Sequence, residues 1–211
     1  MNNVIDFLLN MDQYLNTIAG SYGYLIYAIL FAVVFCETGL VVTPFLPGDS
    51  IIFTCGALAA IGQVNIFLVL AVFAAASILG DTVNYILGKR YGTMLVTKIG
   101  GRFIKERHME EASLFYARYG GAAIFLGRFV PIIRTFVPFV AGISKMRYQK
   151  FVFYNIFGGL VWVALFSLTG FYFGNMPFIK SNFSIVILAI IFISVLPILI
   201  KYITSKKERK S

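Results

Sequence analysis

One stretch, residues 120–142, limits what this chain can fold into more than any other. Its sequence, GGAAIFLGRFVPIIRTFVPFVAG, is apolar enough for a membrane interior, yet it carries Arg128, Arg134, Pro131 and Pro138. An arginine at the centre of a bilayer costs about 2.5–3.5 kcal/mol on insertion scales, and a proline breaks an unsupported helix. We therefore expect a broken helix or re-entrant hairpin, buried in protein and lining a polar cavity. The two arginines would be fixed cations presented to an anion.

The composition places the rest of the chain in a membrane as well. Of its 211 residues, 59% are hydrophobic and only 13% are charged, and several apolar runs are long enough to span a bilayer. This predicts an all-α polytopic membrane protein with one membrane domain, residues 20–204. Apolar residues at helical spacing predict that residues 1–19 form an amphipathic helix at the interface. Residues 205–211 are expected to be a basic cytoplasmic tail.

The charge is distributed very unevenly along the chain. The first 88 residues contain five acids and no Lys or Arg, whereas residues 89–211 contain all 18 basic residues and four acids. The charges of −5 and +14 account for the net +9. In a soluble protein such a basic half would suggest nucleic acid binding. Here the basic residues lie between and after apolar runs, so they mark cytoplasmic segments instead, and we expect no nucleic acid partner.

A second broken apolar segment, residues 38–60, precedes the first. Pro44 and Pro47 interrupt it, and its charges are carboxylates, with Glu37 directly before it and Asp49 within it. The prolines predict the tip of a second re-entrant hairpin, in which Asp49 caps the half-helix that follows. The two hairpins thus carry opposite charges.

Full spans are expected at Val64–Leu87, Phe151–Phe173 and Phe183–Ile203. The first is expected to be interrupted at Gly80 and Asp81, and Asp81 would either face the helix bundle or lie near the interface.

The basic segments also predict a topology. If residues 89–118, the 145–150 cluster and the tail are all cytoplasmic, both ends of the 120–142 hairpin face inward and both ends of the 38–60 hairpin face outward. The N-terminus and the C-terminus are then both cytoplasmic. Two opposed re-entrant hairpins, each followed by a full span, indicate an inverted repeat with a binding site at the repeat interface.

If the hairpins meet, Glu37 and Asp49 approach Arg128 and Arg134. In one interpretation these are ion pairs that only hold two broken helices together. Buried ion pairs add little net stability, and ionisable groups inside membranes are functional candidates by default. In the functional interpretation the arginines bind a phosphate bidentately, and the carboxylates take up and release protons. This arrangement suits an anionic amphiphile whose movement is linked to protons.

Other classes of function find less support in the sequence. No Ser or Cys nucleophile lies beside a histidine, and no metal-ligand cluster or nucleotide-binding loop is present, so we expect no enzyme, cofactor or metal site. Cys36 and Cys55 are expected to be small apolar side chains. His108, between charged neighbours, is expected to be solvated.

With these motifs the sequence resembles the DedA family of bacterial membrane proteins, which shares its core with the VTT (SNARE-associated Golgi protein) domain. The resemblance covers roughly residues 20–175. Its residues are Glu37, Pro44-x-x-Pro47-Gly48-Asp49, Gly80-Asp81-x-x-x-Tyr85-x-x-Gly88, Gly92, Gly127-Arg128-Phe129-x-Pro131-x-x-Arg134, Ala141-Gly142-x-x-x-Met146, Phe151, Asn155, Gly159 and Trp162.

The resemblance implies a lipid flippase in the bacterial cytoplasmic membrane. The favoured substrate is undecaprenyl phosphate, returned to the cytoplasmic leaflet for cell-wall synthesis under the proton motive force. Arg128 and Arg134 would bind its phosphate, and Glu37 and Asp49 would couple the movement to protons. Asp81, Tyr85, Asn155 and Trp162 are expected to support the site, and Pro44, Pro47, Pro131 and Pro138 to break the hairpins.

Several alternatives remain open. A phospholipid such as phosphatidylethanolamine also offers a phosphate, and its ammonium group suits Glu37 or Asp49. A proton-coupled exporter of cationic solutes would use the acids for its substrate and the arginines as counter-ions. A membrane scaffold would use all four charges for the fold alone. A homo-oligomer is compatible with each of these.

Overall fold

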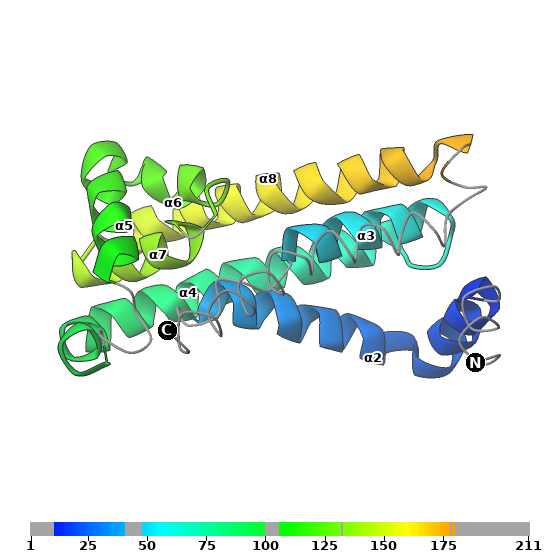
Figure 1. The fold of residues 1–211 in the computed structure, drawn as a ribbon, viewed down its shortest axis with the longest axis horizontal. Helices are drawn as coiled ribbons and strands as arrows, with labels where there is room; N and C mark the ends of the chain where they lie inside the picture. The colour runs from blue at the N-terminus through cyan, green and yellow to red at the C-terminus, as the bar shows by residue number, and fades with distance from the viewer. Residues whose placement is uncertain (1–10, 41–47, 100–105, 132, 178, 180–211) are drawn as a thin grey trace, which may run out of the picture. The chain divides into compact units, whose positions relative to one another are not determined.

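The described part of the chain is entirely helical. The computed structural model describes residues 11–40, 48–99, 106–131, 133–177 and 179. Within these ranges there are seven α-helices and no strand (Figure 1). The helices are α2 (Met11–Gly39), α3 (Gly48–Ala60), α4 (Ile66–Ile99), α5 (Glu106–Tyr119), α6 (Ala122–Gly127), α7 (Ile133–Ile143) and α8 (Tyr148–Gly174).

Two of these helices are long and apolar enough to cross a membrane. The apolar parts are Ile66–Gly92 in α4 and Tyr148–Gly174 in α8, with 27 residues each. At about 1.5 Å per residue, each spans roughly 40 Å, more than the roughly 30 Å hydrocarbon core of a bilayer. The expected third span, residues 183–203, and the tail lie outside the described residues.

The chain divides into two compact units. Unit 1 comprises residues 1–28, 47–69 and 166–211, and unit 2 comprises residues 29–46 and 70–165. Helices α2, α4 and α8 each contribute residues to both units. Unit 2 contains Glu37, Asp81, Arg128 and Arg134, whereas Asp49 belongs to unit 1.

In unit 1, α3 lies in backbone contact with the last turns of α8. A β-carbon added to Gly56 would lie 2.1 Å from the carbonyl oxygen of Ser167, and one added to Gly170 would lie 2.0 Å from that of Phe53. Only glycine at both positions permits this approach. The ring of Phe53 also packs against Phe173, with 5.5 Å between the centroids.

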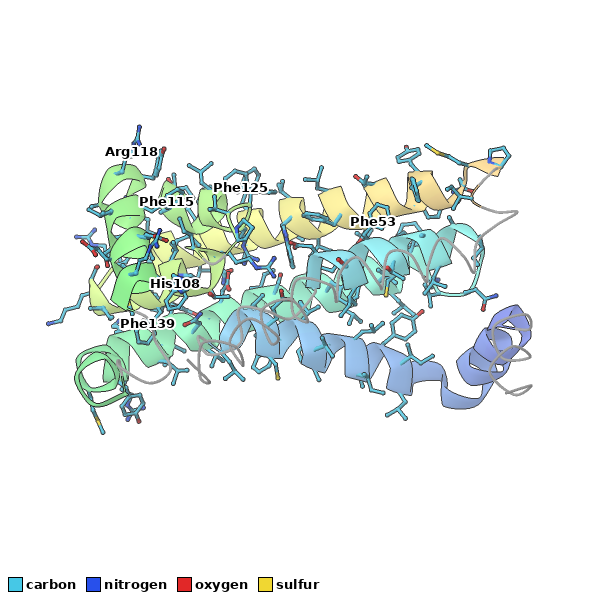
Figure 2. The ribbon with its side chains drawn as sticks, viewed as in Figure 1. Phe53, His108, Phe115, Arg118, Phe125 and Phe139 are labelled. Carbon is cyan, nitrogen blue, oxygen red and sulfur yellow. The ribbon has the colours of Figure 1, made fainter. Side chains whose placement is uncertain are left out.

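In unit 2, α5, α6 and α7 pack together (the green helices of Figure 1). His108 of α5, labelled in Figure 2, is half-buried and meets the ring of Phe136 on α7 edge-on, with 5.8 Å between the centroids. His108 is therefore only partly solvated, because the amphipathic α5 turns this side chain toward α7. By contrast, Arg118 at the end of α5 extends away from the cluster (Figure 2).

Helix α4 approaches both α7 and the end of α2 to backbone contact. A β-carbon on Gly142 would lie 2.2 Å from the carbonyl oxygen of Tyr85, and one on Gly88 would lie 2.1 Å from that of Phe139. One on Gly80 would lie 3.0 Å from the amide nitrogen of Gly39. Small residues thus bring α4 close to the elements that carry the arginines and Glu37.

Helix α4 is not interrupted at Gly80 and Asp81, so that expectation was wrong. The helix continues from Ile66 to Ile99. A glycine inside a helix costs only about 1 kcal/mol relative to alanine, and here it permits close packing against α2. The basic segment expected at 89–118 is accordingly shared between the end of α4 and α5.

At the N-terminal side, α2 begins at Met11 and continues through Gly20 and Gly23 to Gly39. Residues 11–19 are thus the first turns of α2, not a helix separated by a break. Residues 1–10 lie outside the described residues, and the interfacial location of the 1–19 segment stays a prediction.

The segment 120–142 consists of two helices, α6 and α7, with a break between them that contains Arg128 and Pro131. Pro138 does not break the segment, contrary to expectation: it lies buried inside α7. A proline within a helix removes one backbone hydrogen bond, and the tight packing of α7 against its neighbours compensates for this loss. Pro44 and Pro47 lie outside the described residues.

Candidate functional site

Arg128 follows the last residue of α6, and its side chain is 5% exposed. Its Nη2 lies 2.6 Å from Oδ2 of Asp81 on α4, and both side chains are buried. The same Nη2 donates a hydrogen bond of 2.6 Å to Oδ1 of Asn155 on α8. One nitrogen of the guanidinium group therefore contacts both a carboxylate and an amide.

Arg134 is the second residue of α7, and its Nη2 forms an ion pair with Oε1 of Glu37 near the end of α2. Glu37 is fully buried, whereas the side chain of Arg134 is 13% exposed. The guanidinium carbon of Arg134 also lies 5.7 Å from the ring centroid of Trp162, a cation–π contact. Both arginines are therefore held by carboxylates from other helices.

Asn155 fixes the position of Arg128. Its Nδ2 donates to the carbonyl oxygen of Ile78 at 2.9 Å and to Oγ1 of Thr82 at 3.2 Å. The amide is thus oriented by α4 while its Oδ1 accepts from Arg128. Of the four residues expected to support the site, Asp81, Asn155 and Trp162 contact an arginine.

Tyr85, the fourth, lies apart from the arginine contacts. Its hydroxyl donates to the carbonyl oxygen of Met146 at 2.5 Å, and its ring stacks on Phe151 with 4.3 Å between the centroids. These contacts join α4 to the end of the α7 segment and to α8, so Tyr85 supports the fold around the site.

Asn84 also belongs to the site, although the sequence did not indicate it as a site residue. It is fully buried, and its Nδ2 donates to the carbonyl oxygens of Thr38 at 3.1 Å and Thr135 at 2.7 Å. It therefore joins the end of α2 to the first turn of α7. The available signal was its position three residues after Asp81, which places both side chains on one face of α4.

A small cavity lies between these groups. It is lined by Thr38, Asp81, Arg128, Arg134, Thr135 and Trp162, and it has room for about one water molecule.

Among the described residues, three buried polar atoms around this site have no hydrogen-bond partner. They are Oε2 of Glu37, Nε of Arg128 and Oδ1 of Asn84. Buried polar groups are nearly always paired, so a water molecule or the polar group of a ligand would be needed to satisfy these atoms.

Asp49 belongs to unit 1, where it lies in the first turn of α3. The helix already includes Gly48 and Asp49, so Asp49 does not precede it as a cap but lies inside its first turn, where a carboxylate interacts favourably with the positive end of the helix dipole. Its expected approach to Arg128 and Arg134, and its role with protons, stay predictions.

The described helices and the site together define a helical membrane protein that holds two arginine–carboxylate pairs beside a small cavity. The chain matches the VTT domain over residues 46–172. It is 43% identical to Protein DedA of Escherichia coli (strain K12) over 206 residues, which cover 97% of this chain and 94% of the relative. The chain belongs to the DedA family of membrane proteins.

Two further relatives support this assignment. An uncharacterized membrane protein of Mycobacterium tuberculosis (strain H37Rv) is 40% identical over 194 residues, covering 91% of this chain and 85% of the relative. Inner membrane protein YghB of E. coli K12 is 34% identical over 157 residues, covering 74% and 72%. No solved structure matches the chain.

Proposed function

We propose that the protein is a flippase for a phosphate-bearing lipid. The observation that carries this proposal is the placement of the buried Arg128 and the nearly buried Arg134 on the wall of one cavity inside a membrane protein. Arginines at such depth are expensive, and paired guanidinium groups suit a phosphate because they can bind its oxygens bidentately. A lipid phosphate is the anion that a bilayer supplies.

The carboxylates compensate the positive charge of the two arginines when no substrate is bound. Asp81 and Glu37 neutralise Arg128 and Arg134 in the described structure. A substrate phosphate would replace a carboxylate at an arginine, and the released carboxylate can then accept a proton. This exchange would couple the movement of the lipid to protons. We propose that Asp49 also takes part in this coupling.

The proposal includes a membrane arrangement. The break between α6 and α7 supports a re-entrant hairpin at 120–142, and we propose a second, opposed hairpin at 38–60, related to it by an inverted repeat. Both termini are proposed to be cytoplasmic, on the distribution of basic residues.

Within this proposal, undecaprenyl phosphate is the favoured lipid and the bacterial cytoplasmic membrane the location, since the relatives named above are bacterial. Phosphatidylethanolamine is the second candidate. The carboxylates beside each arginine favour it, since they could accept its ammonium group while the arginines bind its phosphate. We further propose that the protein moves its lipid without chemical change and is not an enzyme.

The test uses purified protein in liposomes with labelled undecaprenyl phosphate in one leaflet, with and without a pH gradient. We expect rapid movement that responds to the gradient in the parent protein. Arg134→Ala should lose it, and Arg134→Lys should keep only part of it, because lysine keeps the charge but not the bidentate geometry. The matched control is Arg118→Ala, an exposed arginine at the end of α5.

Each other result points to a specific alternative. Movement of phosphatidylethanolamine alone would change the substrate, and equal movement by Arg134→Ala would remove the assigned role of the arginine. Transport of organic cations without lipid movement would replace the proposal with a cation exporter. Full function after apolar replacement of Glu37, Asp49, Arg128 and Arg134 together would favour a membrane scaffold, in which the four charges serve only the fold.

A further inference from the structure

Asp81 stands out among the acids of unit 2 because it contacts an arginine and also lines the cavity. Its Oδ2 lies 2.6 Å from Nη2 of Arg128, and it shares the cavity wall with Arg128 and Arg134. Glu37, the other paired acid, is not part of that wall. An anion entering the cavity therefore meets Asp81 as its direct competitor.

Arg128 is arranged to exchange one anion for another. Its Nη2 already contacts Asp81 and Asn155, whereas its Nε is buried with no partner among the described residues. Nε and Nη2 form one edge of the guanidinium plane, the edge that binds two oxygens of a phosphate. A phosphate that occupies this edge must take the place of Asp81 at Nη2.

Asn155 allows this exchange without loss of the arginine's position. Its Nδ2 is held by Ile78 and Thr82 of α4, and its Oδ1 retains Nη2 of Arg128. Because Asn155 is neutral, it neither repels an incoming phosphate nor changes its own charge. Arg128 is therefore held in place while its charged partner changes.

We propose that Asp81 is the displaceable counter-ion of Arg128, and that it takes up a proton when a lipid phosphate replaces it. This inference rests on the proposed function and assigns part of its proton linkage to one residue. A buried carboxylate that has lost its cation is expensive and becomes neutral by protonation. The carboxylate gains one proton from water, no other bond changes, and the proton leaves when Asp81 pairs with Arg128 again.

The charged groups facing Asp81 are few in the described part of unit 2. Arg128 follows α6, and Arg134 on α7 shares the cavity and is itself paired with Glu37 of α2. From α8 the neighbouring polar side chains are Asn155 and Trp162, both neutral. After displacement, Asp81 thus faces two cations that are each already bound to another anion.

Calorimetry on the full-length protein in detergent tests the inference. A single-chain alkyl phosphate is titrated at a pH above its second ionisation, so that it binds without changing its own protonation. The titration is repeated in two buffers of different ionisation enthalpy, which gives the number of protons that the protein takes up on binding. We expect about one proton per phosphate in the parent protein. Asp81→Asn should still bind the alkyl phosphate, at equal or higher affinity, with that uptake lost. Glu110→Gln, an exposed acid on α5, is the matched control.

A second arm uses inorganic phosphate alone. Uptake with both ligands supports the inference and assigns recognition to the phosphate group, whereas uptake with the alkyl phosphate alone supports it with a lipid as the ligand. If Asp81→Asn does not fold, Asp81→Glu retains a carboxyl group at a changed distance from Arg128. The pH midpoint of proton uptake should then move, and an unmoved midpoint would overturn the inference.

Binding without proton uptake in the parent protein, or full uptake by Asp81→Asn, would also overturn the inference. In both cases the proposed function would stand, provided the parent protein still moves lipid phosphate in liposomes. Failure of the parent protein both to bind the alkyl phosphate and to move the lipid would instead remove the proposed function and this inference together.

Discussion

At the residue scale, the chain offers two ion pairs in very different surroundings. Glu37 and Arg134 are buried or nearly so, whereas Arg107 and Glu111 are exposed on α5 and separated by one helical turn. Water screens the second pair, so it contributes about 0–1 kcal/mol. Removing one partner of a buried pair leaves an uncompensated charge, at a cost of about 3–5 kcal/mol.

We therefore predict strong coupling between Glu37 and Arg134. Glu37→Leu and Arg134→Met should each destabilise the protein by about 3–5 kcal/mol, and the double variant should be far less destabilised than the sum of the two. Denaturant unfolding in detergent measures the cycle, and the same cycle on Arg107 and Glu111, both replaced by Ala, is the control. Additive effects at Glu37 and Arg134 would show that the two side chains do not stabilise the fold as an ion pair.

A second prediction concerns Asn84, which holds two backbone carbonyls. Asn84→Ala should lower stability by about 1–3 kcal/mol, since the carbonyls of Thr38 and Thr135 lose their amide donor in a buried place. Asn175→Ala is the control, because that amide bonds one carbonyl at the exposed end of α8. Thermal unfolding of the two variants compares them, and equal small effects would show that Asn84 does not join α2 to α7.

At the scale of elements, the close approach of α4 and α7 yields a third prediction. Gly142→Ala should destabilise the protein by about 1–3 kcal/mol, because the new methyl would meet backbone atoms of Tyr85 and Lys89 at 2.2 and 2.7 Å. Gly120 has a positive φ of 57° and nothing within 4 Å of an added β-carbon.

The matched control is therefore Gly120→Asn, since asparagine tolerates this left-handed conformation. It should keep near-parental stability in the same thermal unfolding measurement. If Gly142→Ala is as stable as Gly120→Asn, α4 and α7 do not depend on their backbone contact.

The broken segment also shows what the sequence can predict at this scale. Two arginines and Pro131 in an apolar run correctly indicated a break, because neither is tolerated in an unsupported membrane helix. The same reasoning wrongly predicted breaks at Pro138 and Gly80, which lie inside α7 and α4. Both residues are weak helix formers in isolation, yet packing against neighbouring helices outweighs local propensity, and that packing is not visible in a single sequence.

The partner of each arginine was likewise only partly predictable. The sequence marked Glu37 and the arginines through their cost in a membrane, and Glu37 does pair with Arg134. That Asp81 pairs with Arg128 could not be read from the chain, since it depends on how α4 rotates and packs. Asn84 and the two threonines at the cavity are uncharged polar residues, so no charge distinguishes them in the sequence as site residues.

At the scale of the whole molecule, the fourth prediction is the membrane topology. In a protein with Cys36 and Cys55 replaced by Ser, we expect Gln63→Cys to react with an impermeant thiol reagent only from the outside. Glu110→Cys should react only from the cytoplasmic side. Labelling of intact cells and of inverted vesicles distinguishes the two. Reaction of the cysteine at position 63 from the cytoplasmic side would contradict the proposed opposed hairpins and inverted repeat.

The contact between Arg134 and Trp162 has a practical consequence. Trp162 is the only tryptophan in the chain, so all the indole fluorescence of the native protein comes from a ring that faces the candidate phosphate-binding arginine. A ligand that draws Arg134 away from this ring changes the surroundings of that single fluorophore. The unlabelled protein therefore carries its own optical reporter of site occupancy, and stopped-flow emission can follow substrate binding in real time.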